Sequence, residues 1–297
     1  MELKYLFLLG LVFILYSVSV WASGREGFES GESLFVEDPF DATYASIYNA
    51  LWNPEDKMKY ERVSIQEMAL ADWPISNVNI LDLSCKTAAN ACWFVQFGVK
   101  YTGVDASEDM ISQAKKDCPS ATFKKGDPTD AKLFAPKAFS HVFMFNFSAY
   151  SIPNAKLFSD NAYMWTQPGG YFVVHLVDPD KFDPLLDLAS PFAAFSLQKY
   201  SLERQTDSEI YFDQFKYVGK FNKKNNEDSA TYEETLTYFD TTKSPKNIKY
   251  REQKQEWTMP SVPRMIDIFK SSGFRHKETL DLVSAGKEYQ YLVFFTK

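Results

Sequence analysis

The stretch from residue 80 to residue 107, ILDLSCKTAANACWFVQFGVKYTGVDAS, most limits what this chain can fold into. An apolar run leads into Asp82, a turn of mostly small residues follows, a helical stretch reaches Phe97, and a second apolar run ends at Asp105. This order predicts a strand, turn, helix, strand and acid unit of a parallel sheet. Since ligands of such sheets lie beyond the carboxyl ends of the strands, Asp82, the turn and Asp105 are expected to line one crevice.

Asp105 lies about 20 residues beyond the turn, a spacing at which a carboxylate can accept hydrogen bonds from ribose hydroxyls. The stretch resembles the first motif of the class I S-adenosylmethionine (SAM)-dependent methyltransferases. That motif normally continues from its Asp into Gly-x-Gly-x-Gly, and here the three glycine positions hold Ser84, Lys86 and Ala88. Glycine permits positive φ and a close approach of the backbone to the ligand. Two expectations follow: a retained SAM site with Lys86 near the methionine end of the cofactor, or a degenerate pocket.

Later segments follow the order of the same family. Residues 121–124 read as a third strand before Asp127, residues 141–146 as a fourth, and WTQPGGYFVVHL at residues 165–176 closely matches the family's Leu-x-Pro-Gly-Gly segment before a fifth strand. In relatives, the acid at the position of Asp127 reaches the adenine amino group. The resemblance implies cofactor contacts by Asp82, Ser84, Lys86, Ala88, Asp105, Ala106, Asp127, Pro128 and Asn146.

The expected fold is therefore α/β, a Rossmann-like seven-stranded methyltransferase sheet whose last strand is antiparallel, at residues 39–297. Between the fifth strand and the last helix lies an excursion of roughly 85 residues, too long for a simple connection. Residues 210–221, 230–239 and 248–259 alternate polar and apolar side chains, which predicts an inserted antiparallel sheet within residues 196–260. By analogy with relatives that cover their substrate this way, candidate pocket or supporting residues are Tyr211, Phe215, Tyr217, Tyr232, Tyr238 and Trp257.

An amphipathic helix is expected at residues 40–52, where Tyr44, Tyr48 and Leu51 share helical spacing. In similar methyltransferases an N-terminal helix closes over SAM. The resemblance therefore makes Tyr44 or Tyr48 a contact to the cofactor carboxylate or sulfonium, and an aromatic face stabilises such a cation. Ordinary packing of this aromatic stripe is the alternative.

The chain begins with a separate piece, residues 1–24. Residues 5–22 form an uncharged, almost wholly apolar run, long enough for a hydrophobic helix that spans a bilayer. A single-pass membrane anchor is the first interpretation, and a signal peptide cleaved after Ala22 is the alternative. Lys4 and Arg25 flank the run about equally, so its orientation is not determined. Residues 25–38 read as a tether rich in Gly, Ser and Glu.

The cysteines favour a reducing compartment. Cys85, Cys92 and Cys118 are an odd number and lack the short paired spacing of a metal site, so no metal is expected. We expect Cys85 and Cys92 to pack as ordinary side chains. Glycosylation of the sequon at Asn146 would block the active-site end of a strand. The domain is therefore expected in the cytosol, with secretion after signal cleavage as the alternative.

Composition narrows the function classes. The net charge of −7 makes a nucleic-acid partner unexpected, because such surfaces need a basic excess. No glycine-rich pyrophosphate turn is present, which disfavours an NAD enzyme. A SAM-dependent methyltransferase with a small-molecule N or O acceptor is the leading interpretation, and a catalytically inactive binding or scaffold protein is the alternative. His175 and Tyr150 are the predicted proton acceptors, where the acceptor carries a proton that must leave.

Overall fold

A computed structural model describes residues 32–190, 198, 201–224, 227–238 and 249–297. The predicted membrane anchor at residues 5–22 lies outside the described residues. Among the helices that are described, none is both long and apolar enough to cross a membrane.

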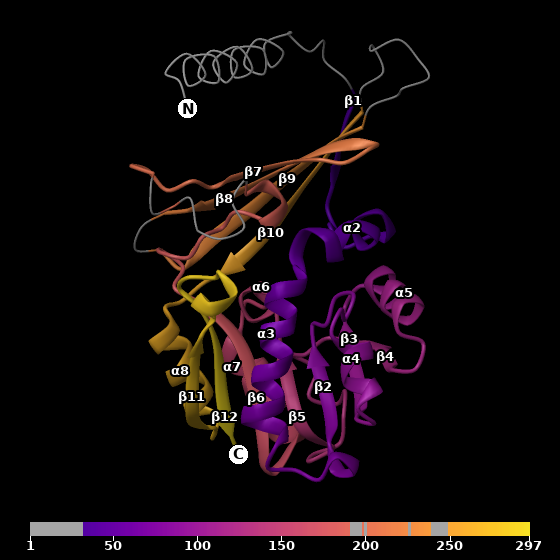
Figure 1. Cartoon of the computed structure of the whole chain (residues 1–297), viewed down its shortest axis with the longest axis vertical. Helices are drawn as coiled ribbons and strands as arrows, with labels where there is room; N and C mark the ends of the chain where they lie inside the picture. The colour runs from indigo at the N-terminus through magenta and orange to yellow at the C-terminus, as the bar shows by residue number, and fades with distance from the viewer. Residues whose placement is uncertain (1–31, 191–197, 199–200, 225–226, 239–248) are drawn as a thin grey trace, which may run out of the picture.

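A seven-stranded sheet forms the base of the molecule (Figure 1). Its strands follow the order β4-β3-β2-β5-β6-β12-β11. Strand β12 is antiparallel to both β6 and β11, and the other neighbours are parallel, so the predicted sheet with an antiparallel last strand is confirmed. The strands are β2 (Asn79–Leu83), β3 (Lys100–Asp105), β4 (Thr122–Lys125), β5 (Phe139–Met144), β6 (Thr166–Val177), β11 (Arg275–Asp281) and β12 (Gln290–Thr296).

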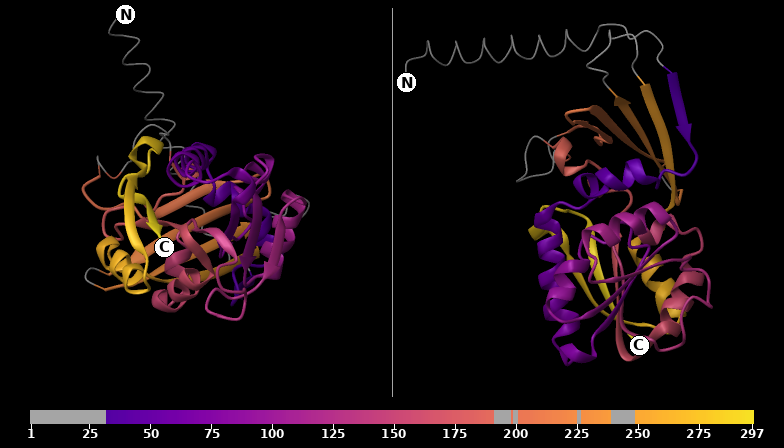
Figure 2. Two further views of the ribbon diagram at one scale, coloured as in Figure 1. Left: turned by 90° about the horizontal axis from the view of Figure 1, so that it is seen from below. Right: turned by 90° about the vertical axis from the view of Figure 1, so that its right-hand side faces the viewer.

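Helices cover both faces of this sheet (Figure 2). Side chains alternate across a strand, so Ile80 of β2 packs in one apolar cluster with Phe94, while Leu81 packs in the other with Phe158. Burial on both faces explains why the central strands read as continuous apolar runs. The helices are α2 (Ala42–Trp52), α3 (Glu55–Ile65), α4 (Ala91–Gln96), α5 (Glu108–Asp117), α6 (Ser148–Ser151), α7 (Ala155–Trp165) and α8 (Val262–Ser271).

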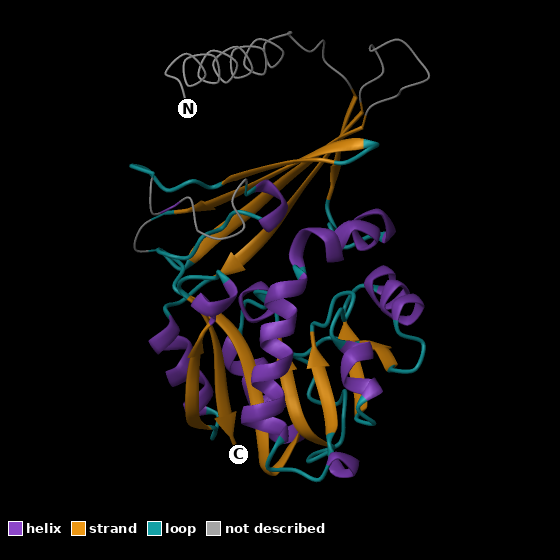
Figure 3. Ribbon diagram, viewed as in Figure 1, coloured by secondary structure: helices purple, strands orange, loops and turns teal. Residues whose placement is uncertain are grey.

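A second sheet lies beyond the carboxyl ends of the parallel strands (Figure 3). It confirms the predicted antiparallel insertion, but residues 210–221 are not one strand, because β7 ends at Tyr211 and β8 begins at Phe215. Strand β1 comes from the predicted tether and pairs in parallel with β10. The order is β1 (Glu32–Val36), β10 (Lys249–Thr258), β9 (Ser229–Tyr238), β8 (Phe215–Lys223) and β7 (Asp207–Tyr211).

A buried carboxylate ties helix α2 to the second sheet. Burial raises the pKa of Glu234, which projects from β9. Tyr44 of α2 donates its hydroxyl proton to this carboxylate and accepts a hydrogen bond from Trp52 Nε1 at 2.8 Å. Three strand residues complete the carboxylate's hydrogen bonds: Tyr217 at 2.6 Å, and Gln253 and Gln255 at 2.9 Å each.

Cys92 and Cys118 form a disulfide that joins α4 to the end of α5. The expected simple packing of Cys92 is therefore wrong, because a partner 26 residues away in sequence is brought beside it by the fold. Cys85 is buried and free, as expected. Disulfides persist in oxidising compartments, so this bond argues against the cytosolic placement expected from the cysteine count.

Replacing Tyr44 by Phe tests the attachment of α2. Glu234 loses a donor and Trp52 Nε1 loses its acceptor, so we expect the free energy of unfolding to fall by about 1–3 kcal/mol in urea titrations. The matched control is Tyr211→Phe. Tyr211 is 68% exposed, and its hydroxyl donates a hydrogen bond to Glu209. It should stay within about 0.5 kcal/mol of the parent protein. Equal losses in the two variants would contradict the role given to Glu234.

Candidate active site

The turn after β2 keeps a left-handed backbone at all three glycine positions of the motif. Ser84 and Lys86 have φ of 52° and Ala88 has φ of 50°. This conformation costs a residue with a Cβ about 1–2 kcal/mol. Hydrogen bonds hold the turn in place: Cys85 N donates to the Val104 carbonyl at 2.9 Å, and Lys86 N donates to Asp105 Oδ2 at 2.9 Å. The glycines are lost, but the backbone shape that they serve is kept.

A cavity of about 310 Å³ opens against this turn. It brings together five of the predicted site residues, which are Asp82, Ser84, Lys86, Ala88 and Asn146. Other predicted residues lie outside its lining. Asp127 is exposed, and its Oδ1 accepts a hydrogen bond from Thr129 N, while Ala106 is also exposed and the Pro128 carbonyl is bound by Asn161.

Two buried acceptors on this cavity have no hydrogen-bond partner among the described residues. They are Asp82 Oδ1 and Asn90 Oδ1. Burial raises the pKa of Asp82 to about 7, although the hydroxyl of Tyr101 donates to its other oxygen and lowers the pKa. Unpaired buried acceptors are costly, so the pair suits a ligand that brings donors or positive charge.

Lys86 lies in a different place from the one expected. Its ammonium is 3.7 Å from Asp105 Oδ2 and 3.9 Å from the centre of the Phe40 ring. It therefore pairs with Asp105, the carboxylate expected to bind ribose. The sequence shows that Lys86 departs from the glycine motif. It does not show that the ammonium pairs with Asp105, because the left-handed backbone of the turn sets the direction of the side chain.

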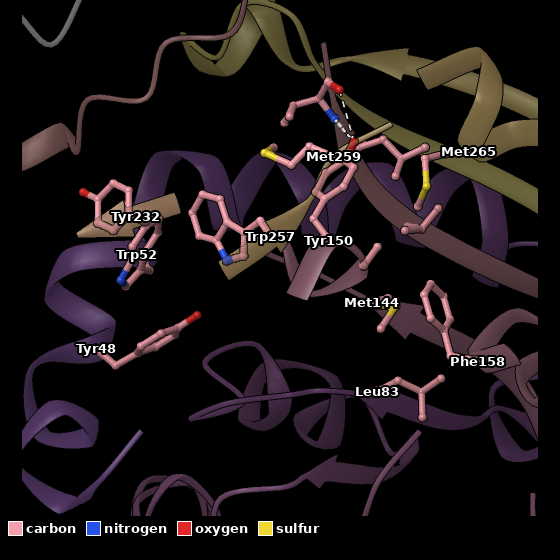
Figure 4. Close-up of a cluster of buried hydrophobic side chains, with 14 of the residues drawn as sticks. Tyr48, Trp52, Leu83, Met144, Tyr150, Phe158, Tyr232, Trp257, Met259 and Met265 are labelled. Atoms are coloured by element: carbon pink, nitrogen blue, oxygen red, sulfur yellow. Dashed lines mark hydrogen bonds between the residues drawn. The ribbon is translucent and has the colours of Figure 1, made fainter. Parts of the chain in front are cut away.

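Tyr48, one turn after Tyr44 on α2, faces the cofactor side. It lines a cavity of about 250 Å³ with Lys86, Asn146 and Phe147. Burial raises the pKa of the Tyr48 hydroxyl, and the nearby charge of Asp105 raises it further. Figure 4 shows its ring projecting from α2 close to the aromatic cluster around Trp52. Tyr44 points instead to the second sheet through Glu234.

A third cavity, of about 480 Å³, lies between α2, the end of β5 and the second sheet. Its walls are aromatic: Trp257 stacks between Phe147 and Tyr232, with ring centres 5.5 and 5.6 Å away. Trp52 meets this stack edge-on (Figure 4). Asn146 lines all three cavities and thus joins them.

Comparisons with known proteins agree with this geometry. Residues 80–170 match a family model described as a methyltransferase domain. The matched residues include the turn after β2 and the strands β3, β4 and β5. No curated protein sequence matches it.

Several solved methyltransferase structures resemble this chain in fold. The sugar N-methyltransferase KedS8 from Streptoalloteichus has a TM-score of 0.64 at 16% identity, covering 91% of this chain and 99% of its own. The CcbJ methyltransferase from Streptomyces caelestis has a TM-score of 0.63 at 14% identity, covering 88% and 98%. SAM-bound CalS10, an amino pentose methyltransferase from Micromonospora echinaspora, has a TM-score of 0.57 at 14% identity, covering 91% and 99%. At these identities the likeness shows the shared fold.

The two predicted proton acceptors, Tyr150 and His175, are both buried. The Tyr150 hydroxyl donates to the Val177 carbonyl at 3.1 Å and accepts from Val177 N at 2.9 Å. His175 Nε2 is 3.1 Å from Gln290 Oε1. Burial lowers the pKa of His175 well below its usual value, and the charge of Lys57 lowers it further. Their catalytic roles stay predictions.

Sequence reasoning missed two lysines that line the aromatic cavity. Lys57 lies in the first turn of α3, a helix that was not expected, and Lys287 precedes β12. The available signal for α3 was the spacing of Lys57 and Glu61, four residues apart as in helical ion pairs. Lys287 carried no such signal, because it lies in a loop that only the fold brings to the cavity.

Glycine substitutions test the shape of the turn. Ala88→Gly removes a buried methyl group but relieves a left-handed residue, whereas Ala114→Gly removes a buried methyl group from the interior of helix α5. We expect Ala114→Gly to cost more stability than Ala88→Gly, by about 1–2 kcal/mol in urea titrations. An equal or larger loss at Ala88 would mean that the turn is not left-handed in solution.

Proposed function

We propose that this protein is a SAM-dependent methyltransferase acting on a nitrogen or oxygen of a small molecule. The observation that carries the proposal is the turn after β2, which keeps the left-handed backbone and opens a cavity onto Asp82. An aromatic cavity of about 480 Å³ adjoins it through Asn146. The sugar and amino pentose methyltransferases among the structural neighbours support a small acceptor.

The residues present fit SAM, which when bound supplies a methyl group on a sulfonium. The unpartnered oxygens of Asp82 and Asn90 would accept hydrogen bonds from its ammonium group, and the Asp105 carboxylate would accept those of the ribose hydroxyls. Tyr48 presents an aromatic ring to the same side of the site. Transfer from a sulfonium needs positioning and exclusion of water more than it needs strong acids or bases. The aromatic wall formed by Trp52 and Trp257 serves both needs.

Lys86 must release Asp105 before a ribose can bind there, because its ammonium already pairs with that carboxylate. The lysine therefore competes with the cofactor from within the chain. This pair is also the observation that favours the second candidate function, a catalytically inactive binding protein, in which Lys86 permanently occupies the site.

The remaining parts of the proposal rest on the sequence. His175 and Tyr150 are the predicted proton acceptors. Residues 5–22 are proposed as a single-pass anchor that holds the domain at a membrane, with a cleaved signal peptide as the alternative. The disulfide between Cys92 and Cys118 favours a domain outside the cytosol in either case.

Calorimetric titration of the full-length chain with SAM tests the function. We expect binding in the micromolar range, weakened at least tenfold by Asp105→Asn, which corresponds to about 1.4 kcal/mol or more. Lys86→Met should tighten binding severalfold, because it removes the internal partner of Asp105. Lys115→Met, an exposed lysine of α5, is the matched control and should bind as the parent protein does.

The outcomes separate the two functions. Failure of every folded variant to bind SAM would overturn the methyltransferase proposal. Binding only by Lys86→Met would favour the inactive protein, in which the lysine fills the ribose position. Weaker binding by Lys86→Met would show that the lysine holds the cofactor instead of competing with it.

A further inference from the structure

Two lysines form the floor of the aromatic cavity, and methyl transfer itself gives them no task. The Lys57 side chain is 5% exposed and the Lys287 side chain is 16% exposed, and both line the cavity. Lys57 Nζ is 2.8 Å from Glu61 Oε1 and donates to Asn146 Oδ1 at 2.5 Å. An ammonium group is kept at such a depth only when charge or hydrogen bonds compensate the lost hydration.

Three carboxylates act on the two lysines, those of Glu61, Asp183 and Asp187, and the last two also line the cavity. Glu61, with a side chain that is 1% exposed, is the buried partner of Lys57. Lys287 pairs with Asp187, but that side chain is 41% exposed and its charge is screened by water. Of the three carboxylates only Glu61 is buried, so the two ammonium groups are incompletely compensated, an arrangement that favours an anion in the cavity.

The titration of nearby groups agrees with this balance. Burial, followed by the charge of Lys57, lowers the pKa of Lys287 to about 8. After burial, the charge of Lys57 is also the next cause of the lowered pKa of His175. From the other side, the charges of Asp183 and Glu61 act to raise the pKa of Lys287, but they do not cancel the effect of burial.

The walls define the rest of the ligand. The stack of Phe147, Trp257 and Tyr232 offers flat apolar surface in the same cavity as the two lysines. A planar ring packs well against such faces. Asn146 contacts Lys57 and also lines the cofactor-side cavities, so a group bound by Lys57 lies near the junction where methyl transfer would occur.

We propose that the methyl acceptor is a ring-bearing carboxylate whose anionic group binds Lys57 and Lys287 while its ring packs against Trp257. The inference rests on the proposed function and names the acceptor class of that same site. Carboxylate binding favours the charged form of Lys287, so the lysine takes up a proton when the complex forms near pH 8. The affinity is constant where Lys287 is already charged, below its pKa, and falls as the pH rises through and above about 8.

The test compares phenylacetate with phenylacetamide, an isostere without charge, on the full-length chain saturated with S-adenosylhomocysteine. The change in tryptophan fluorescence reports occupancy, because Trp52 and Trp257, two of the six tryptophans, line the cavity. We expect phenylacetate to bind at least tenfold more tightly than the amide at pH 7, and Lys287→Gln to abolish that preference. Lys270→Gln, an exposed lysine of α8, is the matched control and should keep it.

Calorimetry at pH 8 in two buffers of different ionisation enthalpy supplies a second readout. Proton uptake on phenylacetate binding is expected for the parent protein and should vanish in Lys287→Gln, which a purely structural lysine would not produce. Equal binding of acid and amide, or a preference that survives Lys287→Gln, would overturn the inference. Separate titration with S-adenosylhomocysteine keeps the two proposals apart: cofactor binding without carboxylate preference removes only the acceptor class, whereas absent cofactor binding removes the function itself.

Discussion

The hydrogen-bonded Glu234 carboxylate is the interaction on which the site depends. It fixes Tyr44, and through Tyr44 it fixes Trp52 at the end of α2. The same helix presents Tyr48 to the cofactor-side cavity and Trp52 to the aromatic cavity. A buried carboxylate is tolerated because four side-chain donors satisfy it, two tyrosine hydroxyls and two glutamine amides. The second sheet thereby becomes a wall of the site as well as its cover.

The sequence predicted the central sheet because the physical signals for it are local. Apolar runs ending in Asp82 and Asp105 mark strands buried on both faces, and parallel pairing brings their carboxyl ends to one edge. Long-range contacts left no such signal. The pairing of Lys86 with Asp105, the approach of Lys287 to the cavity, and the addition of β1 beside β10 each depend on how distant segments pack. The sequence shows which residues are present at these positions, but it does not show which distant residues they contact.

Asn146 shows why a sequence motif needs its structural surroundings. The residue opens an Asn-x-Ser sequon, which argued for a cytosolic domain because a glycan there would block the site. In the fold its side chain accepts from Lys57 and donates to Asn53, and its backbone is left-handed with φ of 47°. Because both ends of the Asn146 amide are hydrogen-bonded within the fold, we expect no glycan on it in any compartment. The sequon therefore does not indicate where the domain lies. The disulfide of Cys92 then stands as the stronger observation.

Charged side chains line both halves of the site. Asp82 and Lys86 line the cofactor side, while Lys57 and Lys287 line the acceptor side together with the more exposed Asp183 and Asp187. A cationic methyl donor and an anionic acceptor would each meet complementary charge and approach one another across Asn146. Methylation of the bound carboxylate itself would leave Lys57 and Lys287 without their anionic partner, so the carboxylate holds the acceptor and the methyl group would go to another of its nitrogen or oxygen atoms. Where that atom carries a proton, the proton must leave, which is the role predicted for His175 or Tyr150.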